Sequence, residues 1–252
     1  MLLRVDVTFW VVLGLLLVAA VGVAAFARLG RAREIAVAGI RAAVQLGAVS
    51  LVIGWVIGAV APLLGFVALM YGVAVWTAGR RVTRNRTWWW AALPIGAGVA
   101  PVMTVLLLTG VVPLKGIAVI PVVGILIGGA LTATVLSGRR ALDELHARRG
   151  EVEAGFALGL PERDARMEVA RPAAADALLP GLDQTRTVGL VTLPGAFVGM
   201  LLGGASPVQA GAVQLFVLVA LMAVQAVAVG TVLELVARGR LNRDETEDPQ
   251  RR

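Results

Sequence analysis

The chain has 252 residues, of which 58% are hydrophobic and 15% charged, with a mean hydropathy of +0.85 and a formal net charge of +7. This is more apolar surface than a soluble domain of that length can bury, so the composition indicates a membrane protein. Cysteine is absent, which excludes disulfides, thiolate metal sites and cysteine nucleophiles.

Seven apolar runs, each close to the roughly 20 residues that a helix needs to cross a bilayer, predict an all-α polytopic membrane protein with about seven transmembrane helices. The runs cover residues 5–26, 38–60, 62–79, 88–110, 116–137, 187–205 and 208–234. The first run lacks a basic n-region and a cleavage context, so we expect it to be retained. The sixth is interrupted by Leu193-Pro194-Gly195, and we expect it to be kinked and protein-facing, or re-entrant.

Basic residues are distributed unevenly over the connecting segments. All of them except Arg4 and Lys115 fall around the start of the second run, after the third run, in the long segment 138–186 or in the tail. The positive-inside rule then predicts an external N-terminus and a cytoplasmic C-terminus, and it explains the basic character better than nucleic-acid binding does. We expect a transmembrane permease domain at 1–237, including a cytoplasmic loop at 138–186, and a disordered cytoplasmic tail at 238–252. Trp88, Trp89 and Trp90 fit an interfacial aromatic belt.

The long loop is predicted to contain two helices. Its apolar positions recur at helical intervals, as in an amphipathic helix. They are Leu142, Leu145, Val152 and Phe156. Gly159 can end that helix in the left-handed conformation, and Pro161 suits the first position of a second helix with Glu162 and Asp164 in its first turn. Residue types alone leave a solvated interhelical loop as an equal alternative to a docking knob.

The spacing from Glu153 to Pro172 resembles the loop by which ABC-transporter membrane subunits bind their ATPase: E-A-A, three residues, Gly, nine residues, an aliphatic residue, one residue, Leu-Pro. Gly155, Val169 and Arg171 depart from that pattern, where Ala, Ile and Leu are expected. The resemblance implies a set of ATPase-coupling residues. They are Glu153, Ala154, Gly155, Gly159, Pro161, Val169 and Pro172.

Further stretches resemble the bacterial iron-export ABC permeases, to which plant aluminium-tolerance membrane proteins are related. They are 41–46 (RAAVQL), 119–121 (VIP) with Gly124 and Gly128, and 179–199 (LPGLDQTRTVGLVTLPGAFVG), followed by Pro207. In that family, Gly-Asn-Ala-Met is expected after the proline of the fifth apolar run. This chain has Gly128-Gly129-Ala130-Leu131 there, so Gly129 and Leu131 stand in place of Asn and Met. An amide and a thioether that could contact a transported species are therefore missing.

The chain contains no G-x-x-x-x-G-K-[ST] motif, and its single lysine, Lys115, lies in a segment that cannot cradle a phosphate. We therefore expect ATP on a separate ABC ATPase subunit and no cofactor bound by this chain. Because ATP-driven closure needs two nucleotide-binding domains, we expect a homodimer of the permease. Motifs of hydrolytic enzymes such as G-x-S-x-G and H-E-x-x-H are absent, so the chain is not expected to be an enzyme.

Polar groups inside membrane spans are candidate functional sites. The candidates for a substrate path are Arg41, Gln45, Asp183, Gln184, Thr187, Pro194 and Gly195. For Asp183, structural pairing with Arg186 or Arg41 is favoured over attraction of a cation. Three glutamines of the last run, with Met200 and Met222, could also line a path, although packing is the favoured explanation for any one of them. The glutamines are Gln209, Gln214 and Gln225.

The resulting expectation is a multi-pass permease subunit in the cell membrane, exporting a metal ion such as iron. Its metal ligands are unknown, since His146 lies in the long loop with no second ligand nearby. Two alternatives stay open. One is an ABC permease for an organic solute such as a nucleotide sugar, and the other is a channel or carrier that needs no ATPase.

Overall fold

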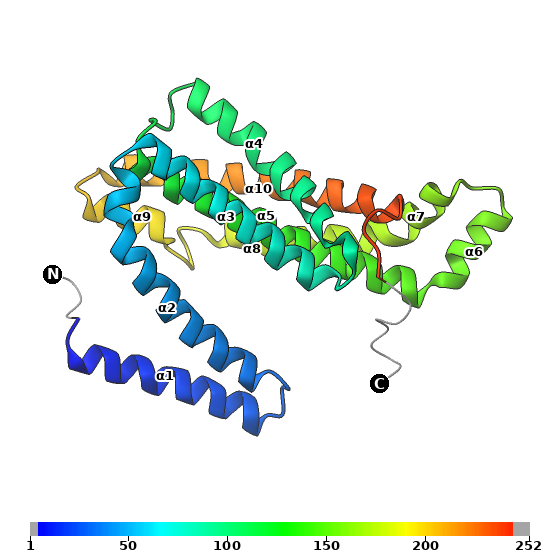
Figure 1. Ribbon diagram of the computed structural model, residues 1–252, viewed down its shortest axis with the longest axis horizontal. Coiled ribbons are helices and arrows are strands. Elements are labelled where there is room, and N and C mark those ends of the chain that lie inside the picture. The colour runs from blue at the N-terminus through cyan, green and yellow to red at the C-terminus, as the bar shows by residue number, and fades with distance from the viewer. Residues whose placement is uncertain (1–4, 244–252) are drawn as a thin grey trace. The chain divides into compact units, whose positions relative to one another are not determined.

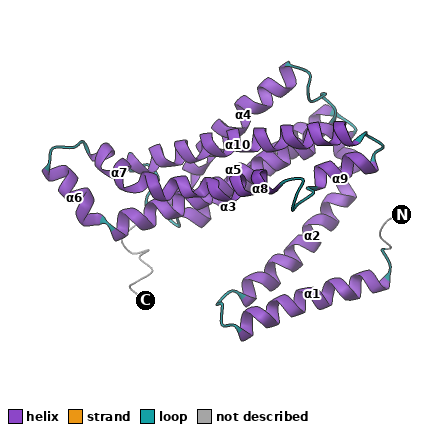
Figure 2. Ribbon diagram, turned by 180° about the vertical axis from the view of Figure 1, so that it is seen from behind, coloured by secondary structure: helices purple, strands orange, loops and turns teal. Residues whose placement is uncertain are grey.

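A computed structural model describes residues 5–243, and in that part of the chain the secondary structure is helical, with connecting loops (Figures 1 and 2). Six helical segments are long and apolar enough to cross a membrane. They are α1 (Val7–Phe26), α2 (Ala32–Ile57), α3 (Val60–Val82), η1 (Arg86–Ala91) continued by α4 (Ala92–Leu108), α5 (Gly116–Ala147) and α10 (Pro207–Ala237). The shorter helices are α6 (Arg149–Ala157), α7 (Glu162–Ala175), η2 (Asp176–Leu178), α8 (Leu179–Thr187) and α9 (Gly195–Leu202). The prediction of an all-α polytopic membrane protein is confirmed.

The chain divides into two compact units, residues 1–59 and 60–252. In the first unit, α1 and α2 pack as a helical hairpin. Asp6 caps α1 by accepting a hydrogen bond from the Phe9 N–H at 3.0 Å. A Cβ at Gly39 would lie 2.7 Å from Leu17 Cδ1, so the absence of a side chain at that position lets the two helices approach closely.

In the second unit, α5 and α10 run side by side and pack against α3 and α4 (Figures 1 and 2). Glycines permit the closest approaches. A Cβ at Gly98 in α4 would lie 2.8 Å from the Val224 carbonyl oxygen in α10, and one at Gly138 in α5 would lie 2.9 Å from Val82 in α3. Small residues at helix contacts are how apolar helices pack tightly where lipid removes the hydrophobic driving force between them.

The sixth apolar run does not form a continuous helix. Residues 188–194 are non-helical between α8 and α9, and Pro194 occupies the position before the first residue of α9. The C-terminal end of α10 contacts α7 through the hydrogen bond between Glu234 and Arg163. From that end, the 31 residues of α10 extend about 46 Å back to the N-cap residue, Ser206. The chain between α7 and α10 therefore traverses the second unit as two short helices joined by an unwound segment, where Pro194 has no N–H to extend a helix.

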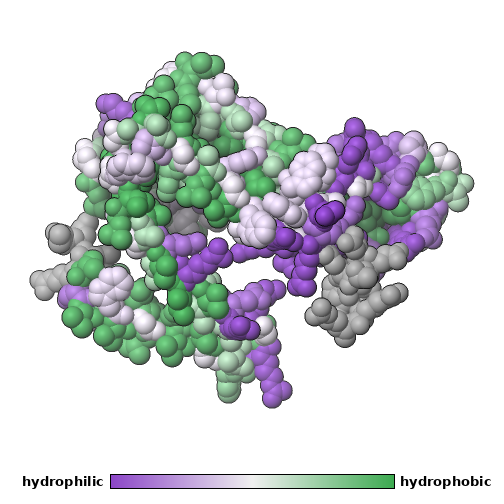
Figure 3. Space-filling view, in the orientation of Figure 1, coloured by the Kyte–Doolittle hydropathy of each residue, from purple (hydrophilic) through white to green (hydrophobic). Residues whose placement is uncertain are grey.

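Charged loops of the second unit gather at one end, which we call the charged end. There the Asn85 amide donates hydrogen bonds to the Asn242 side chain at 2.8 Å and to its carbonyl at 3.0 Å. The Arg243 guanidinium donates to the Val82 carbonyl at 3.1 Å. The loop after α3, the α5–α8 segment and the residues after α10 thus share one end, as the distribution of basic residues predicted. Figure 3 shows hydrophilic side chains collected there, whereas apolar side chains cover much of the rest of the visible face of the second unit.

The aromatic residues after α3 lie at this same end. Trp89 and Trp90 stack with ring centroids 4.2 Å apart, and the Arg80 guanidinium lies 4.7 Å from the centre of the Trp76 ring. A Cβ at Gly79 would lie 2.2 Å from the Trp88 carbonyl oxygen, so glycine permits η1 to pack directly on α3.

Part of the predicted tail packs on the bundle. Leu241 is fully buried in the cluster formed by α3, α5, α7 and α10. The expected disordered tail at 238–252 therefore includes six residues, 238–243, that the structure describes, and at least Leu241 to Arg243 are held by specific contacts. The remainder of the expected tail, residues 244–252, lies outside the described part of the chain.

Candidate functional site

The turn between α6 and α7 is set by Gly159, whose φ is +86°. The Gly159 N–H donates to the Phe156 carbonyl at 2.9 Å, and the Leu160 N–H donates to the Gly155 carbonyl at 3.0 Å. This is the Schellman arrangement, in which a left-handed glycine satisfies the last carbonyls of a helix. The predicted helix end at Gly159 is confirmed. Pro161 occupies the N-cap of α7, one position before the predicted one, and Glu162 and Asp164 lie in the first turn as expected.

Helices α6 and α7 pack through small side chains. Val152, Ala165 and Val169 are buried together, with Leu145 of α5 against them. A Cβ at Gly155 would lie only 2.9 Å from the Ala165 Cβ. The departure from Ala at position 155 is thus explained by packing, because glycine lets α6 lie close to α7.

Helix α7 is in turn fixed to the two longest helices. Its Ala170 and Ala174 are fully buried in one cluster with Ala141 of α5 and with Leu235 and Val236 of α10. The loop predicted as a helix-turn-helix knob is therefore an anchored element. We call α6, the turn 158–161 and α7 the α6–α7 knob.

Ion pairs reinforce this attachment. The Arg163 guanidinium donates two hydrogen bonds to the Glu234 carboxylate of α10, at 2.9 and 2.6 Å, and Arg238 bonds the same carboxylate. The hydrogen bonds to Glu234, and then to Asp164, raise the pKa of Arg163 above its ordinary value. The fork geometry of Arg with a carboxylate gives such a pair a defined orientation. Glu234 thus pairs with Arg238, four residues further along the chain, and Arg163 joins this pair from α7.

The free surface of the α6–α7 knob combines charge with exposed apolar side chains. Leu158 is 84% exposed, Leu160 44% and Phe156 39%. We call these three residues the apolar tip. They lie at the charged end, on the same helix pair as polar side chains such as Glu153, which accepts a hydrogen bond from Arg149 at 3.0 Å.

The seven residues predicted for ATPase coupling fall into two groups. Gly155 and Val169 are buried between helices and shape the α6–α7 knob. The others are accessible on its surface. These are Glu153, Ala154, Gly159, Pro161 and Pro172.

The residues predicted for a substrate path are only partly brought together. Arg41 and Gln45 belong to α2 in the first unit, whereas the others belong to α8 and α9 in the second. Asp183 accepts a bond from Arg186 at 3.4 Å, which is the structural pairing favoured above. Gln184 and Thr187 lie in the last turns of α8, Pro194 is the N-cap residue of α9, and Gly195 is the first residue of α9.

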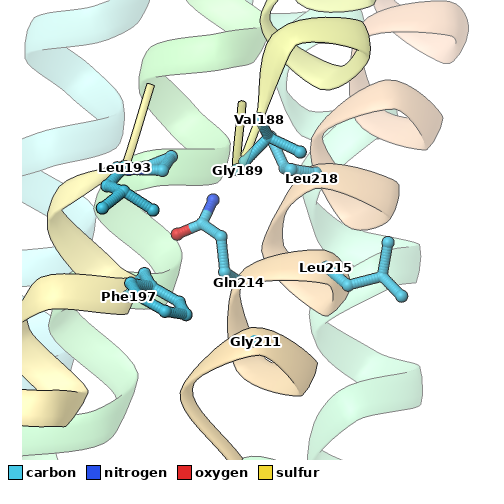
Figure 4. A pocket seen from close by; sticks show the side chains of 9 residues that line it. Val188, Gly189, Leu193, Phe197, Gly211, Gln214, Leu215 and Leu218 are labelled. Carbon is cyan, nitrogen blue, oxygen red and sulfur yellow. The ribbon is translucent and has the colours of Figure 1, made fainter. Parts of the chain in front are cut away.

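A cavity of about 290 Å³ opens at the break between α8 and α9 (Figure 4). Among the residues predicted for the path, Pro194 lines it. The full lining consists of Val188, Gly189, Leu193, Pro194, Phe197, Gly211, Gln214, Leu215 and Leu218. Gln214 is 4% exposed, and in the described part of the chain its Oε1 has no hydrogen-bond partner. Sequence alone identified Gln214 only as one of three glutamines, because its burial depends on α9 and on the unwound segment.

The departure at Gly129 lies where α5 packs closely against α10. A Cβ at Gly129 would lie 2.5 Å from Leu221 Cδ2, with Gln225 Nε2 at 3.6 Å, and a Cβ at Gly181 would lie 2.1 Å from Gln225 Oε1. Glycines on α5 and α8 thus leave room for the α10 side chains Leu221 and Gln225. Within residues 5–243, no three His, Asp or Glu side chains converge as metal ligands would.

The model of a family described as "Uncharacterised protein family (UPF0014)" matches residues 7–240. Protein ALUMINUM SENSITIVE 3 of Arabidopsis thaliana is 38% identical over 164 residues, covering 65% of this chain and 59% of that protein. UPF0014 membrane protein STAR2 of Oryza sativa subsp. japonica is 36% identical over 201 residues, covering 77% of this chain and 70% of that protein. The Probable iron export permease protein FetB of Escherichia coli is 31% identical over 126 residues, covering 50% of this chain and 48% of that protein.

The match therefore spans less than two thirds of the Arabidopsis and E. coli proteins. No solved structure matches the chain. The resemblance to bacterial iron-export permeases and their plant relatives is confirmed by these similarities. Because the family match extends over nearly all of the described residues, this chain, an all-helical multi-pass membrane protein, belongs to the UPF0014 family.

Proposed function

We propose that this chain is the membrane-spanning permease subunit of an ABC transporter, and that a separate ATPase subunit docks on the α6–α7 knob. The observation that carries the proposal is the apolar tip. Exposed apolar side chains on the membrane-spanning helices are expected to face lipid. The tip instead lies at the charged end, and Leu158 is 84% exposed there. Apolar side chains exposed among charged ones are typical of a surface that binds a protein partner.

The anchoring of α7 supports a mechanical role. Helices α5 and α10 have 32 and 31 residues, so each is about 46 to 48 Å long, against about 30 Å for the hydrocarbon core of a bilayer. Both extend from the charged end through the membrane. A displacement of the docked ATPase would therefore be passed through α7 to the two helices that form the centre of the bundle.

Energy must come from the partner, because the sequence carries no phosphate-cradling loop. Two copies of this chain with two ATPase subunits would make the assembly symmetric. In this proposal the charged end faces the cytoplasm, where the positive-inside rule puts it and where ATP is available.

For the cargo, a metal ion such as iron is the first candidate, supported by the similarity to the Probable iron export permease protein FetB of E. coli. An organic solute is the second candidate. The observation that favours it is the apolar lining of the cavity between α8, α9 and α10, in which Gln214 is the one side chain with hydrogen-bonding groups.

The docking proposal is tested with Leu158→Asp in the chain co-expressed with a Walker-type ATPase from a neighbouring reading frame. Loss of one buried leucine contact is worth about 1.5–3 kcal/mol, so the amount of co-purified ATPase should fall at least about tenfold. Leu114→Asp is the matched control, since Leu114 is 77% exposed in the loop before α5, away from the charged end. Equal retention of the ATPase by both variants would contradict docking at the tip.

The cargo is tested separately by intracellular iron content after deletion of the gene, beside uptake of a sugar nucleotide into inverted vesicles. A rise in iron supports metal export, and ATP-dependent sugar-nucleotide uptake supports the organic solute. Transport at full rate by the chain alone in liposomes without ATP would refute the ABC assignment.

A further inference from the structure

A buried amide faces the cavity at the break between α8 and α9. The Gln214 side chain projects from α10 into the space bounded by Gly189, Leu193 and Phe197 (Figure 4). It is 4% exposed, and within the described residues its Oε1 accepts no hydrogen bond. A buried polar atom without a partner destabilises the folded state, so its presence calls for an explanation such as a bound ligand.

The lining of the cavity selects the kind of ligand. None of its nine residues, all within the described part of the chain, carries a charge, an imidazole or a sulfur atom. A bare transition-metal ion is held by several nitrogen, sulfur or carboxylate ligands, and an uncompensated charge is disfavoured in apolar surroundings. One amide offers an acceptor and two donors, which match a hydroxyl or amide group. Phe197 adds an apolar ring beside it.

The main chain at the break provides further polar groups. In residues 188–194 the Gly189 N–H donates to the Thr192 carbonyl at 2.8 Å, in place of a helical hydrogen bond. Helix α9 begins at Gly195 without a side-chain cap. Backbone groups next to the cavity are thus released from regular helical pairing, as at the binding sites of transporters with discontinuous helices. The volume of about 290 Å³ is close to the lower end of ligand pockets, about 300 Å³, and so fits a small organic group.

We propose that this cavity is the cargo site of the permease, and that it binds an uncharged organic group through the Gln214 amide. The inference rests on the proposed transport function. A metal would enter the site only inside a neutral organic chelate. A free neutral solute and a neutral chelate share the required chemistry, and the test below distinguishes them.

Occupancy is measured with a single introduced thiol, because the natural chain contains no cysteine. Leu218→Cys places the thiol at a lining position that is 1% exposed, so the reagent has to enter the cavity to reach it, and the variant keeps Gln214. Val208→Cys is the matched control, since Val208 lies on the same helix, outside the cavity lining, and is 82% exposed. The full-length variants in nanodiscs are labelled with a small methanethiosulfonate reagent. The probes are glucose, a neutral ferric hydroxamate complex, and ferrous ion alone.

We expect labelling of the Leu218→Cys variant to be slowed about three- to tenfold by one or both neutral probes and to be unchanged by ferrous ion alone. Labelling of the Val208→Cys variant should be unchanged by all three. Protection by glucose alone assigns a free solute, and protection by the hydroxamate complex alone assigns a chelate. Absence of labelling in the Leu218→Cys variant, absence of protection by either neutral probe, or equal protection by ferrous ion would overturn the proposal.

Gln214→Met, which keeps length but removes the amide, provides a second measurement that does not depend on the thiol variants. It should weaken cargo-stimulated ATPase activity about three- to tenfold, and in the Leu218→Cys background it should also abolish protection. It should raise the melting temperature of the ligand-free protein by about 2–4 °C, because a buried unpaired oxygen is removed. A fall in melting temperature with unchanged cargo stimulation would identify a structural glutamine and refute the site.

The two proposals fail in different ways. If the ATPase does not dock on this chain, stimulation cannot be measured, yet the labelling experiment on the permease still reports whether the cavity binds a neutral group. If the ATPase docks on this chain but the cavity is not a cargo site, the ATPase still co-purifies, and none of the probes changes the rate of labelling.

Discussion

The second unit contains two pairs of short helices, each joined through a glycine with positive φ. Gly159 between α6 and α7 has φ +86°, and Gly189 between α8 and α9 has φ +81°. The pairs differ in what holds them. Helix α7 has buried side chains along its whole length, from Ala165 to Ala174, whereas α8 and α9 contain no buried residue.

This difference suggests that the two helix pairs have different mechanical roles in the second unit. Segments with few buried contacts open at lower free energy than segments packed into a core. The α6–α7 knob would therefore move as one body with α5 and α10. The α8–α9 segment is where the bundle can rearrange, and it also forms one wall of the Gln214 cavity.

The largest effect is expected from overpacking the anchor of α7. Ala174→Leu inserts a larger side chain into a fully buried position and should lower the free energy of unfolding by about 1–3 kcal/mol. Ala175→Leu, exposed on the same helix, is the control, and Ala196→Leu in α9 should have a small effect. Thermal unfolding in detergent measures all three. Equal damage from Ala196→Leu would remove the contrast between the two regions.

A smaller effect is expected at the two turn glycines. Valine disfavours positive φ, so Gly159→Val and Gly189→Val each introduce strain of about 1–2 kcal/mol. Neither Cβ would meet a neighbouring atom within 4 Å, so strain is the shared cause. Gly159→Val should leave the protein inserted but uncouple ATP hydrolysis from transport. Gly189→Val should lose less stability, because the loosely packed α8 and α9 can shift to relieve the strain.

That pair of variants is compared by ATPase activity, transport and melting temperature in the same membrane preparation. Gly150→Val, at a helical position with open space around its Cβ, controls for the substitution itself. Normal coupled transport by Gly159→Val would remove the central role of the α6–α7 knob.

The smallest effect is expected at the contact between α6 and α7. The Cβ of Gly155→Ala would lie 2.9 Å from the Ala165 Cβ, and this clash should offset the gain of about 1 kcal/mol that alanine brings to a helix. In an Ala165→Gly background the same change should be stabilising. A double-mutant cycle on thermal unfolding should therefore give a coupling energy of about 1 kcal/mol, and additivity of the two changes would show that the helices do not meet there.

Local chemistry made much of the fold predictable. Six of the seven apolar runs form long helices, because a helix satisfies all the backbone hydrogen bonds of an apolar segment in lipid. Gly159 was predictable as a helix end, because few other residues adopt positive φ without strain. The grouping of basic loops at one end of the second unit also followed from their distribution along the chain.

The candidate sites were less accessible to such reasoning. The spacing from Glu153 to Pro172 marked the α6–α7 knob, but only the fold distinguishes the buried Val169 from the exposed Leu158. The sixth run was expected to be irregular because of Pro194, and the structure shows an unwound segment between two short helices. Leu241 lies in a charged stretch, so nothing local to it indicated that it would be buried.

The sequence by itself determined that this is a helical membrane protein with a polar helix pair between its fifth and sixth apolar runs, because hydropathy, helical periodicity and glycine conformation act over a few residues. The tertiary structure decided which of these residues meet. Ala174 became an anchor, and Gln214 became a buried amide whose oxygen has no hydrogen-bond partner among the described residues, through contacts with distant segments. Burial by a distant part of the chain produces no periodic pattern in the local sequence.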